Sequence, residues 1–228
     1  MARVPDQTRG EVVLREAFRA ELDGIVDSLV EMTKLVGSAM SRATTALLDA
    51  DLQTAESVIS DDLTVDQLYR EVEERAIELL ARQGPVASDL RLIVNALRMV
   101  ADLERMGDLA LHIAKVARRR YPGNAIPTEF RPSIHDMGEV AVNIVAKAGE
   151  VIATHDVAKA AELERDDDVM DGLHRNLFTA LLSPTYAGGV ETAIDVTLVG
   201  RYYERFADHA VSVARRVVVI VTGERIHA

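Results

Sequence analysis

The sequence predicts an all-α protein of six helices, arranged as two tandem-repeated antiparallel three-helix bundles. Ala, Leu, Val, Glu, Asp and Arg dominate, aromatic residues make up only 4% and Trp is absent, which is typical of helices packed through aliphatic side chains. Apolar residues recur at helical spacing over long stretches without proline. The second half of the chain also repeats the pattern of the first.

The first half of the chain contains three predicted helices. Apolar residues recur every three or four positions from 11 to about 48. A second helix is predicted over 52–83, where Gly84-Pro85 ends it. The third begins near residue 87 and ends in the basic cluster 118–120, because cations are favoured at a helix C-terminus. Short connections of this kind make consecutive helices antiparallel.

The second half of the chain follows the same scheme after a proline-rich linker. We predict a first three-helix repeat at 1–121, a linker at 122–132 and a second three-helix repeat at 133–228. The helices of the second repeat are predicted at 133–153, 157–182 and 190–221.

The repeat can be followed residue by residue. An offset of 105 aligns the first two helices of each half, and an offset of 100 aligns the third, so the second hairpin connection is five residues shorter. The matched residues include Ala43 and Ala148, Asp51 and Asp156, Asp61 and Asp166, and Ala110 and Ala210. This duplication predicts that each half folds as a similar unit.

The composition excludes several classes of function. A formal net charge of -11 and a pI near 5.0 argue against nucleic acid and anionic lipid as partners. Without Cys, a metal site must use oxygen and imidazole ligands. Residues 1–15 show no signal peptide, and the longest aliphatic run, 217–221, is too short to span a bilayer. We therefore expect a cytoplasmic protein that meets membranes only through partners.

Acidic residues four positions apart form pairs that survive the repeat. Such a pair points the same way from a helix and is mutually repulsive by roughly 0.2–0.5 kcal/mol. The repeated pairs are Asp62/Asp66 and Glu104/Asp108 in the first half, and Asp167/Asp171 and Glu204/Asp208 in the second. Other pairs, such as Asp23/Asp27, have no acidic counterpart, and we interpret them as solvated surface.

The two pairs of each half should face each other. In the first half the pair centres, 64 and 106, have their midpoint at 85, in the turn between two antiparallel helices. In the second half the centres are 169 and 206, and their midpoint, 187.5, falls in the turn 184–189. Each half would thus present four carboxylates at one level, an oxygen-rich site suited to iron, manganese, zinc, magnesium or calcium ions.

Other interpretations of these acids stay open at this point. Glu104 continues an apolar stripe, so its charge needs a cation, but an Arg could supply that cation as well as a metal could. The candidate arginines are Arg98, Arg105, Arg201 and Arg205. Plain solvated helix faces are the third interpretation.

Two histidines lie near these acids. His112 follows Asp108 by one turn and His174 follows Asp171 by three residues, so each is either a ligand or a surface or capping residue. The basic clusters 118–120 and 215–216 are interpreted as solvated helix ends, with an anion-binding patch as the alternative.

Three motifs resemble those of the PhoU family of phosphate-signalling regulators. They are Pro-Val-Ala-Ser-Asp-Leu-Arg at 85–91, Asp-Leu-Glu-Arg-Met-Gly-Asp at 102–108 and Glu-Arg-Phe-Ala-Asp-His-Ala at 204–210. The resemblance spans nearly the whole chain. It implies a cytoplasmic, usually homodimeric, non-enzymatic repressor of the phosphate-starvation response, which acts between the ATPase of the phosphate importer and a membrane sensor histidine kinase.

The resemblance also implies metal clusters on (Glu/Asp)-x-x-x-Asp motifs, which map to the eight acids named above. The chain departs from the family pattern at His112 and Ser212, where Asn is frequent, and at Tyr203, where Leu is frequent. These departures from the family pattern argue against equal metal occupancy in the two halves. We expect a metal-binding adaptor that represses phosphate uptake.

Two rivals to this function can be defined. A ferritin-like di-iron oxidase requires Glu-x-x-His on two helices, and the only such string is 224–227. A purely structural helical scaffold without metal would tolerate replacement of all eight acids by Asn or Gln.

Overall fold

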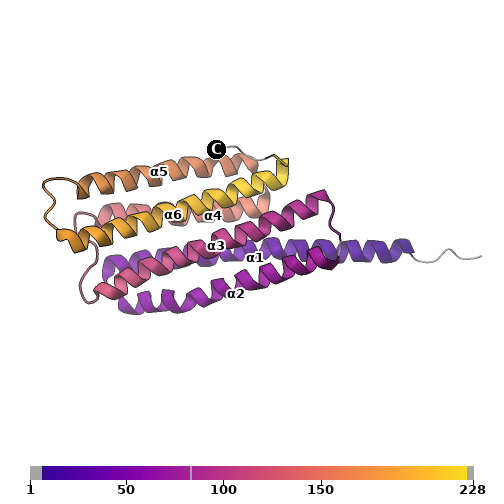
Figure 1. The fold of residues 1–228 in the computed structure, drawn as a ribbon, viewed down its shortest axis with the longest axis horizontal. Coiled ribbons are helices and arrows are strands. Elements are labelled where there is room, and N and C mark those ends of the chain that lie inside the picture. The colour runs from indigo at the N-terminus through magenta and orange to yellow at the C-terminus, as the bar shows by residue number, and fades with distance from the viewer. Residues whose placement is uncertain (1–6, 83, 225–228) are drawn as a thin grey trace, which may run out of the picture.

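The computed structural model describes residues 7–82 and 84–224, and within them the chain folds into six helices (Figure 1). The helices are α1 (Gln7–Asp49), α2 (Leu52–Arg82), α3 (Ala87–Arg120), α4 (Arg131–Thr154), α5 (Val157–Leu181) and α6 (Gly189–Thr222). The predicted fold class is confirmed. Helix bounds agree with the sequence prediction within two residues, except that α1 begins four residues earlier than residue 11.

The connection between the repeats is shorter than the predicted linker. α4 begins at Arg131, so the last two residues of 122–132 already belong to the helix. Pro132 lies in the first turn, where the missing N–H has no partner to lose and the fixed φ suits a helix.

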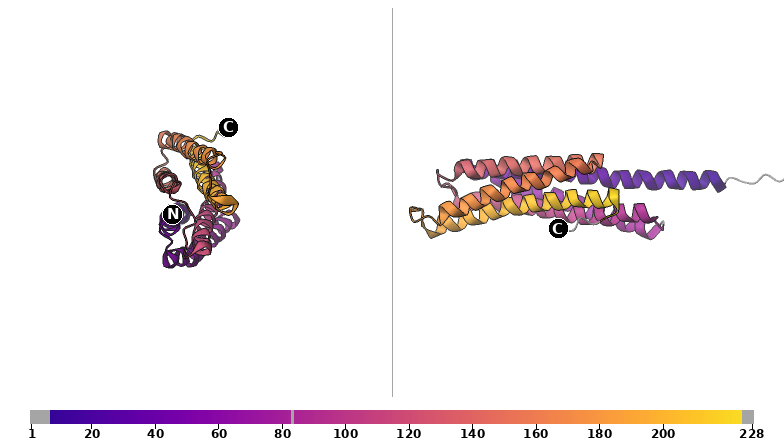
Figure 2. Two further views of the ribbon diagram at one scale, coloured as in Figure 1. Left: turned by 90° about the vertical axis from the view of Figure 1, so that its left-hand side faces the viewer. Right: turned by 90° about the horizontal axis from the view of Figure 1, so that it is seen from above.

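The six helices form two layers that run along the long axis of the molecule. In the end-on view of Figure 2, α3 and α6 lie together on one side, α1 and α4 on the other, and α2 and α5 at the two edges. Among the described residues, α2 packs only on α1 and α3, and α5 only on α4 and α6. Buried side chains of both repeats make one continuous core. No described helix is long and apolar enough to cross a membrane.

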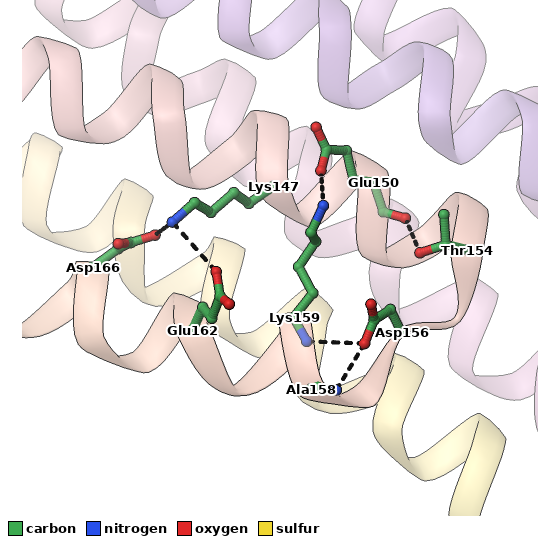
Figure 3. Close-up of polar contacts among 8 residues, drawn as sticks. All are labelled: Lys147, Glu150, Thr154, Asp156, Ala158, Lys159, Glu162 and Asp166. Carbon is green, nitrogen blue, oxygen red and sulfur yellow. Dashed lines mark hydrogen bonds and ion pairs between the residues drawn. The ribbon is translucent and has the colours of Figure 1, made fainter.

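Several repeated acids have structural roles that fix the hairpins. Asp156 caps α5 by accepting hydrogen bonds from the backbone N–H groups of Ala158 and Lys159, at 2.9 and 3.0 Å (Figure 3). Asp51 accepts a bond from the backbone N–H of Thr54 at 3.1 Å, next to the start of α2. The repeated Asp51 and Asp156 are therefore explained by helix initiation.

A second repeated contact joins the first and second helices of each repeat. Asp166 on α5 accepts a hydrogen bond from Lys147 on α4 at 2.8 Å (Figure 3), and Asp61 on α2 accepts one from Arg42 on α1 at 2.8 Å. Arg42 and Lys147 are themselves repeat counterparts at an offset of 105. These two acids therefore join the first and second helices of their repeats.

Ion pairs also join α3 to α6, across the two repeats. The buried carboxylate of Asp195 on α6 accepts hydrogen bonds from Arg119, at 2.5 Å, and from Arg120. Arg118 pairs with Glu56 on α2 at 3.6 Å. Arg118 and Arg119 are exposed, as predicted for a solvated helix end, but all three arginines also pair with acids of neighbouring helices.

Close contact between α1 and α4 depends on glycine. A Cβ placed on Gly149 would lie 2.5 Å from Thr33 Oγ1, and Thr33 is buried and bonded to the Val30 carbonyl on its own helix. Gly172 on α5, by contrast, has no atom within 4 Å of such a Cβ.

Replacing each of these glycines by Ala should change stability in opposite directions. Gly149→Ala forces α1 and α4 apart, an overpacking cost of about 1–3 kcal/mol that outweighs the gain of about 0.5–1 kcal/mol in helix propensity. Gly172→Ala brings only that gain. Urea unfolding of both variants measures the difference. A Gly149→Ala protein as stable as the Gly172→Ala protein would contradict the packing of the two repeats described above.

Candidate metal centres

The first acidic cluster lies between α2 and α3. Asp62 and Asp66 project from α2, and Glu104 and Asp108 from α3, one pair on each of two packed helices. Gly107 lets them approach, since a Cβ there would lie only 3.3 Å from Asp62 Oδ1. All four side chains are partly buried.

The charges of this cluster act on one another across the helix pair. Burial raises the pKa of Asp62, and the negative charges of Asp66 and Asp108 raise it further. Burial likewise raises the pKa of Glu104, followed by the charge of Asp108 on its own helix and those of Asp66 and Asp62 from α2. The structure therefore brings the two predicted pairs together in one negatively charged site.

Arginine neutralises only the α3 side of this cluster. Arg105 lies 2.8 Å from Asp108 and 3.5 Å from Glu104, with 61% of its side chain exposed. Within residues 7–82 and 84–224, no Lys, Arg or His nitrogen lies within 4.0 Å of the carboxylates of Asp62 and Asp66. The ion-pair interpretation thus accounts for half of the cluster.

The second cluster lies between α5 and α6 and has the same composition. Burial, together with the negative charges of Asp208, Asp171 and Glu204, raises the pKa of Asp167 to about 6. Burial and the charge of Asp208 also raise the pKa of Glu204, although Arg201 forms an ion pair with it. Asp171 and Asp208 are more exposed than their counterparts Asp66 and Asp108.

Unpartnered polar atoms concentrate in this second cluster. Among the described residues, four buried side-chain polar atoms make no hydrogen bond, and two of these, Asp167 Oδ1 and His174 Nε2, lie here without any partner. A third, Glu204 Oε2, forms the ion pair with Arg201. A buried acceptor without a donor costs about 1–3 kcal/mol. Cations would satisfy these acceptors, so the residues of the second cluster fit metal ions. Metal binding by the eight acids itself stays a prediction.

The carboxylates are not drawn together around a single point. In the described part of the chain, one group of three potential ligand atoms lies within 4.8 Å, namely His135, Asp136 and Glu139 on α4. That group is fully exposed, and His135 lies 3.7 Å from Asp136, which is ordinary for a surface. The ligand atoms of the predicted clusters are spread more widely than this 4.8 Å limit.

The histidines near the clusters differ in their surroundings. His112 Nδ1 lies 2.5 Å from the Asp108 carbonyl oxygen, and its ring packs on Tyr202 of α6 with centroids 5.3 Å apart. His174 turns toward α6, and burial and the nearby charge of Arg201 lower its pKa. The two histidines therefore hold unequal positions, and only His174 keeps a buried nitrogen unused.

The sequence analysis missed Asp102, which links the two repeats near both clusters. Asp102 on α3 accepts hydrogen bonds from Ser212 at 3.1 Å and Arg216 at 3.0 Å, and lies 3.0 Å from His209 Nδ1, all on α6. Burial raises its pKa, but these bonds lower it below the usual value overall. The sequence contains one signal of this role: Asp102 is an acid without an acidic counterpart, since Tyr202 occupies the matching position of the second repeat.

Paired acidic clusters on a tandem repeat of three helices define a class of helical-repeat proteins with candidate cation sites. The PhoU domain matches this chain twice, at residues 29–117 and 134–217. The chain belongs to the PhoU family.

Relatives and solved structures extend the match over most of the chain. A Mycobacterium tuberculosis protein, phosphate-specific transport system accessory protein PhoU homolog 2, is 53% identical over 92% of this chain and 99% of its own. The Mycobacterium leprae PhoU homolog 1 is 50% identical over 92% of this chain and 95% of its own. The crystal structure of the phosphate transport system regulatory protein PhoU from Streptococcus pneumoniae has a TM-score of 0.84 and 27% identity, covering 92% of this chain and all of that one.

The di-iron oxidase motif finds no support in the described residues. Its string, 224–227, extends beyond Glu224 into residues that lie outside the part of the chain that the structure describes. Glu224 itself is exposed, just after the end of α6.

The raised pKa of Asp167 gives a pH dependence to the metal-free protein. Its carboxyl binds a proton more tightly in the folded state, pKa about 6, than in the unfolded state, near 3.8. The unfolded state therefore binds fewer protons between these values, and stability falls as pH rises from about 4 to about 6. Asp167→Asn should remove this loss and raise the melting temperature at pH 7 in the presence of a chelator.

Asp23 on α1 is exposed, is not among the charges that raise the pKa of Asp167, and supplies the control. Asp23→Asn should leave the pH profile of the melting temperature unchanged. A metal-free Asp167→Asn protein that melts no higher than the unmodified chain at pH 7 would show that the second cluster carries no unfavourable charge.

Proposed function

We propose that this protein is a negative regulator of phosphate uptake and of the phosphate-starvation response, which acts as a metal-binding adaptor. One observation carries the proposal. In each of two hairpins of this PhoU-family chain, carboxylates on facing helices have raised pKa values and few Arg or Lys side chains pair with them. Its relatives are named accessory proteins of the phosphate-specific transport system, and a neighbouring structure is named a regulatory protein of that system.

The cations would act as the counter-charge of each cluster. Asp62, Asp66, Glu104 and Asp108 would hold them between α2 and α3, and the corresponding acids would hold them between α5 and α6. Iron, manganese, zinc and magnesium ions suit these oxygen ligands. Bound cations replace repulsion between the facing rows by attraction, so they fix the distance between the outer helix and its neighbour.

The position of the outer helices is the physical link to signalling. Because α2 and α5 each pack on only two helices in the part of the chain that the structure describes, repulsion at the cluster acts directly on an edge of the molecule. If metal binding favours one position of the outer helix, it also increases the affinity for any partner that recognises that position. The binding of metal and the binding of the partner are then thermodynamically linked.

The proposed partners are the ATPase of the phosphate importer and the membrane sensor histidine kinase. A homodimer in the cytoplasm would meet the membrane only through these proteins. A net charge of -11 disfavours nucleic acid as a partner. No catalytic residue and no enzymatic reaction are part of the proposal.

A structural scaffold without metal is the second candidate, and specific contacts favour it. Arg105 pairs with both acids of its motif, and Arg201 pairs with Glu204. If these pairs neutralise enough charge, the clusters serve only to orient the helices. The experiments below separate the two candidates.

Metal content should depend on the clustered acids and not on acidity in general. We expect the protein purified without metal-affinity resin to contain transition metal by elemental analysis, and to lose it on chelation. Replacing Asp62, Asp66, Glu104 and Asp108 by Asn or Gln should remove the share bound by the first cluster. Asp23→Asn with Asp27→Asn, an exposed pair without a repeat counterpart, is the control and should retain full metal content.

Binding to the importer ATPase should weaken when metal is removed. Couplings between binding sites are typically about 1–3 kcal/mol, so we expect affinity to fall about 5- to 150-fold in chelator. Surface plasmon resonance with immobilised ATPase measures this, and readdition of metal should restore binding. Two results would instead favour the structural scaffold without metal. The affinity for the ATPase would be the same with and without chelator, and a variant with all eight acids replaced by Asn or Gln would still repress a phosphate-starvation reporter.

A further inference from the structure

His174 is placed where the second cluster meets the backbone of α6. It follows Asp171 on α5 by three residues, which puts both side chains on one face of the helix. A Cβ on Gly200 of α6 would lie 3.3 Å from His174 Cδ2 and 3.8 Å from its Nε2. Gly200 lies one helical turn before Glu204. The absence of a side chain at position 200 therefore leaves room for the imidazole beside the acidic site.

The inward nitrogen of His174 has no hydrogen-bond partner. In the described part of the chain, Nε2 is buried and without a partner, as is Asp167 Oδ1 of the same cluster. Glu204 Oε2 makes no regular hydrogen bond but forms an ion pair with Arg201, whose side chain is 51% exposed. Arg201 therefore does not satisfy His174 Nε2 or Asp167 Oδ1.

The first cluster has a different residue at the same position. Tyr69 is the counterpart of His174 at the repeat offset of 105, and its hydroxyl donates a hydrogen bond to Glu73 at 3.2 Å. In the described residues, no atom of the first four acids is buried and unsatisfied. The two clusters thus share their carboxylates, but at this position the second has an imidazole and the first has a phenol.

We propose that His174 is a nitrogen ligand of the second cluster and makes it select borderline cations such as Zn²⁺, Co²⁺ or Fe²⁺ over Mg²⁺. This inference rests on the proposed metal binding and adds that the two halves differ in the metal ions they prefer. Imidazole suits zinc, iron and nickel, whereas Mg²⁺ takes oxygen ligands and retains several waters. The nearby imidazole of the first cluster, His112, instead contacts the Asp108 carbonyl oxygen and packs on Tyr202, so the first cluster is expected to discriminate less between these ions. Because no three of the second cluster's ligand atoms lie within 4.8 Å, side chains rotate toward the ion on binding.

Cobalt reports directly on a nitrogen ligand. In a chain whose first four acids are replaced by Asn or Gln, we expect Co²⁺ titration to give a visible absorption band and a paramagnetically shifted imidazole proton resonance. His174→Gln should remove the shifted resonance. Zn²⁺ affinity should fall at least about tenfold, since even second-shell changes cost about 10- to 100-fold, while Mg²⁺ affinity stays the same.

Two further variants control this experiment. His174→Tyr restores the residue of the first repeat and should behave as His174→Gln does. His112→Gln alters the histidine that packs on Tyr202 and should leave both Co²⁺ signals intact. Melting curves in chelator show whether each variant folds.

The outcomes separate this inference from the proposed function. Unchanged Zn²⁺ affinity and an unchanged imidazole resonance in His174→Gln would overturn the role of His174 and leave metal binding by the acids standing. Absence of any Co²⁺ or Zn²⁺ binding in both the parent and the unmodified chain would overturn both.

Discussion

Repulsion between like charges in partly buried sites is the constraint on which this structure depends. Each outer helix meets its neighbour through facing pairs of carboxylates, and burial raises the pKa of four of these groups. Continuous hydrophobic packing holds the helices together despite this repulsion. The fold therefore keeps negative charge at two places where aliphatic contacts would be more stable, and the proposed cation binding would explain why.

Most of the fold was predictable because two independent signals agree along the chain. Helical periodicity set the elements, and the repeat set their grouping, so the bounds of five helices are within two residues of the prediction. The facing of the acid pairs was predictable from their distance to each turn, since antiparallel helices rise equally from it. Repetition alone could not assign roles, because Asp51, Asp61 and their counterparts repeat as strictly as the cluster acids do.

The remaining features depend on contacts between the repeats, where local periodicity carries no information. Asp195 and Asp102 bind arginines more than 70 residues away in sequence, and neither has an acidic counterpart in the other half. The ion pairs of Arg105 with Asp108 and of Arg201 with Glu204 were also not predictable, because residue spacing fits a metal ion and an arginine equally well as the partner of these acids. The inward nitrogen of His174 depends on a rotamer and a facing glycine.

The ion network at Asp102 ties the two clusters to each other. Asp102 precedes Glu104 by two residues on α3, and its partner His209 directly follows Asp208 on α6. A shift of α3 at its own acids would thus be transmitted to α6, which carries the other set. If the two clusters bind ions as proposed, any effect of an ion in one half on the affinity of the other half has an equal effect in the reverse direction.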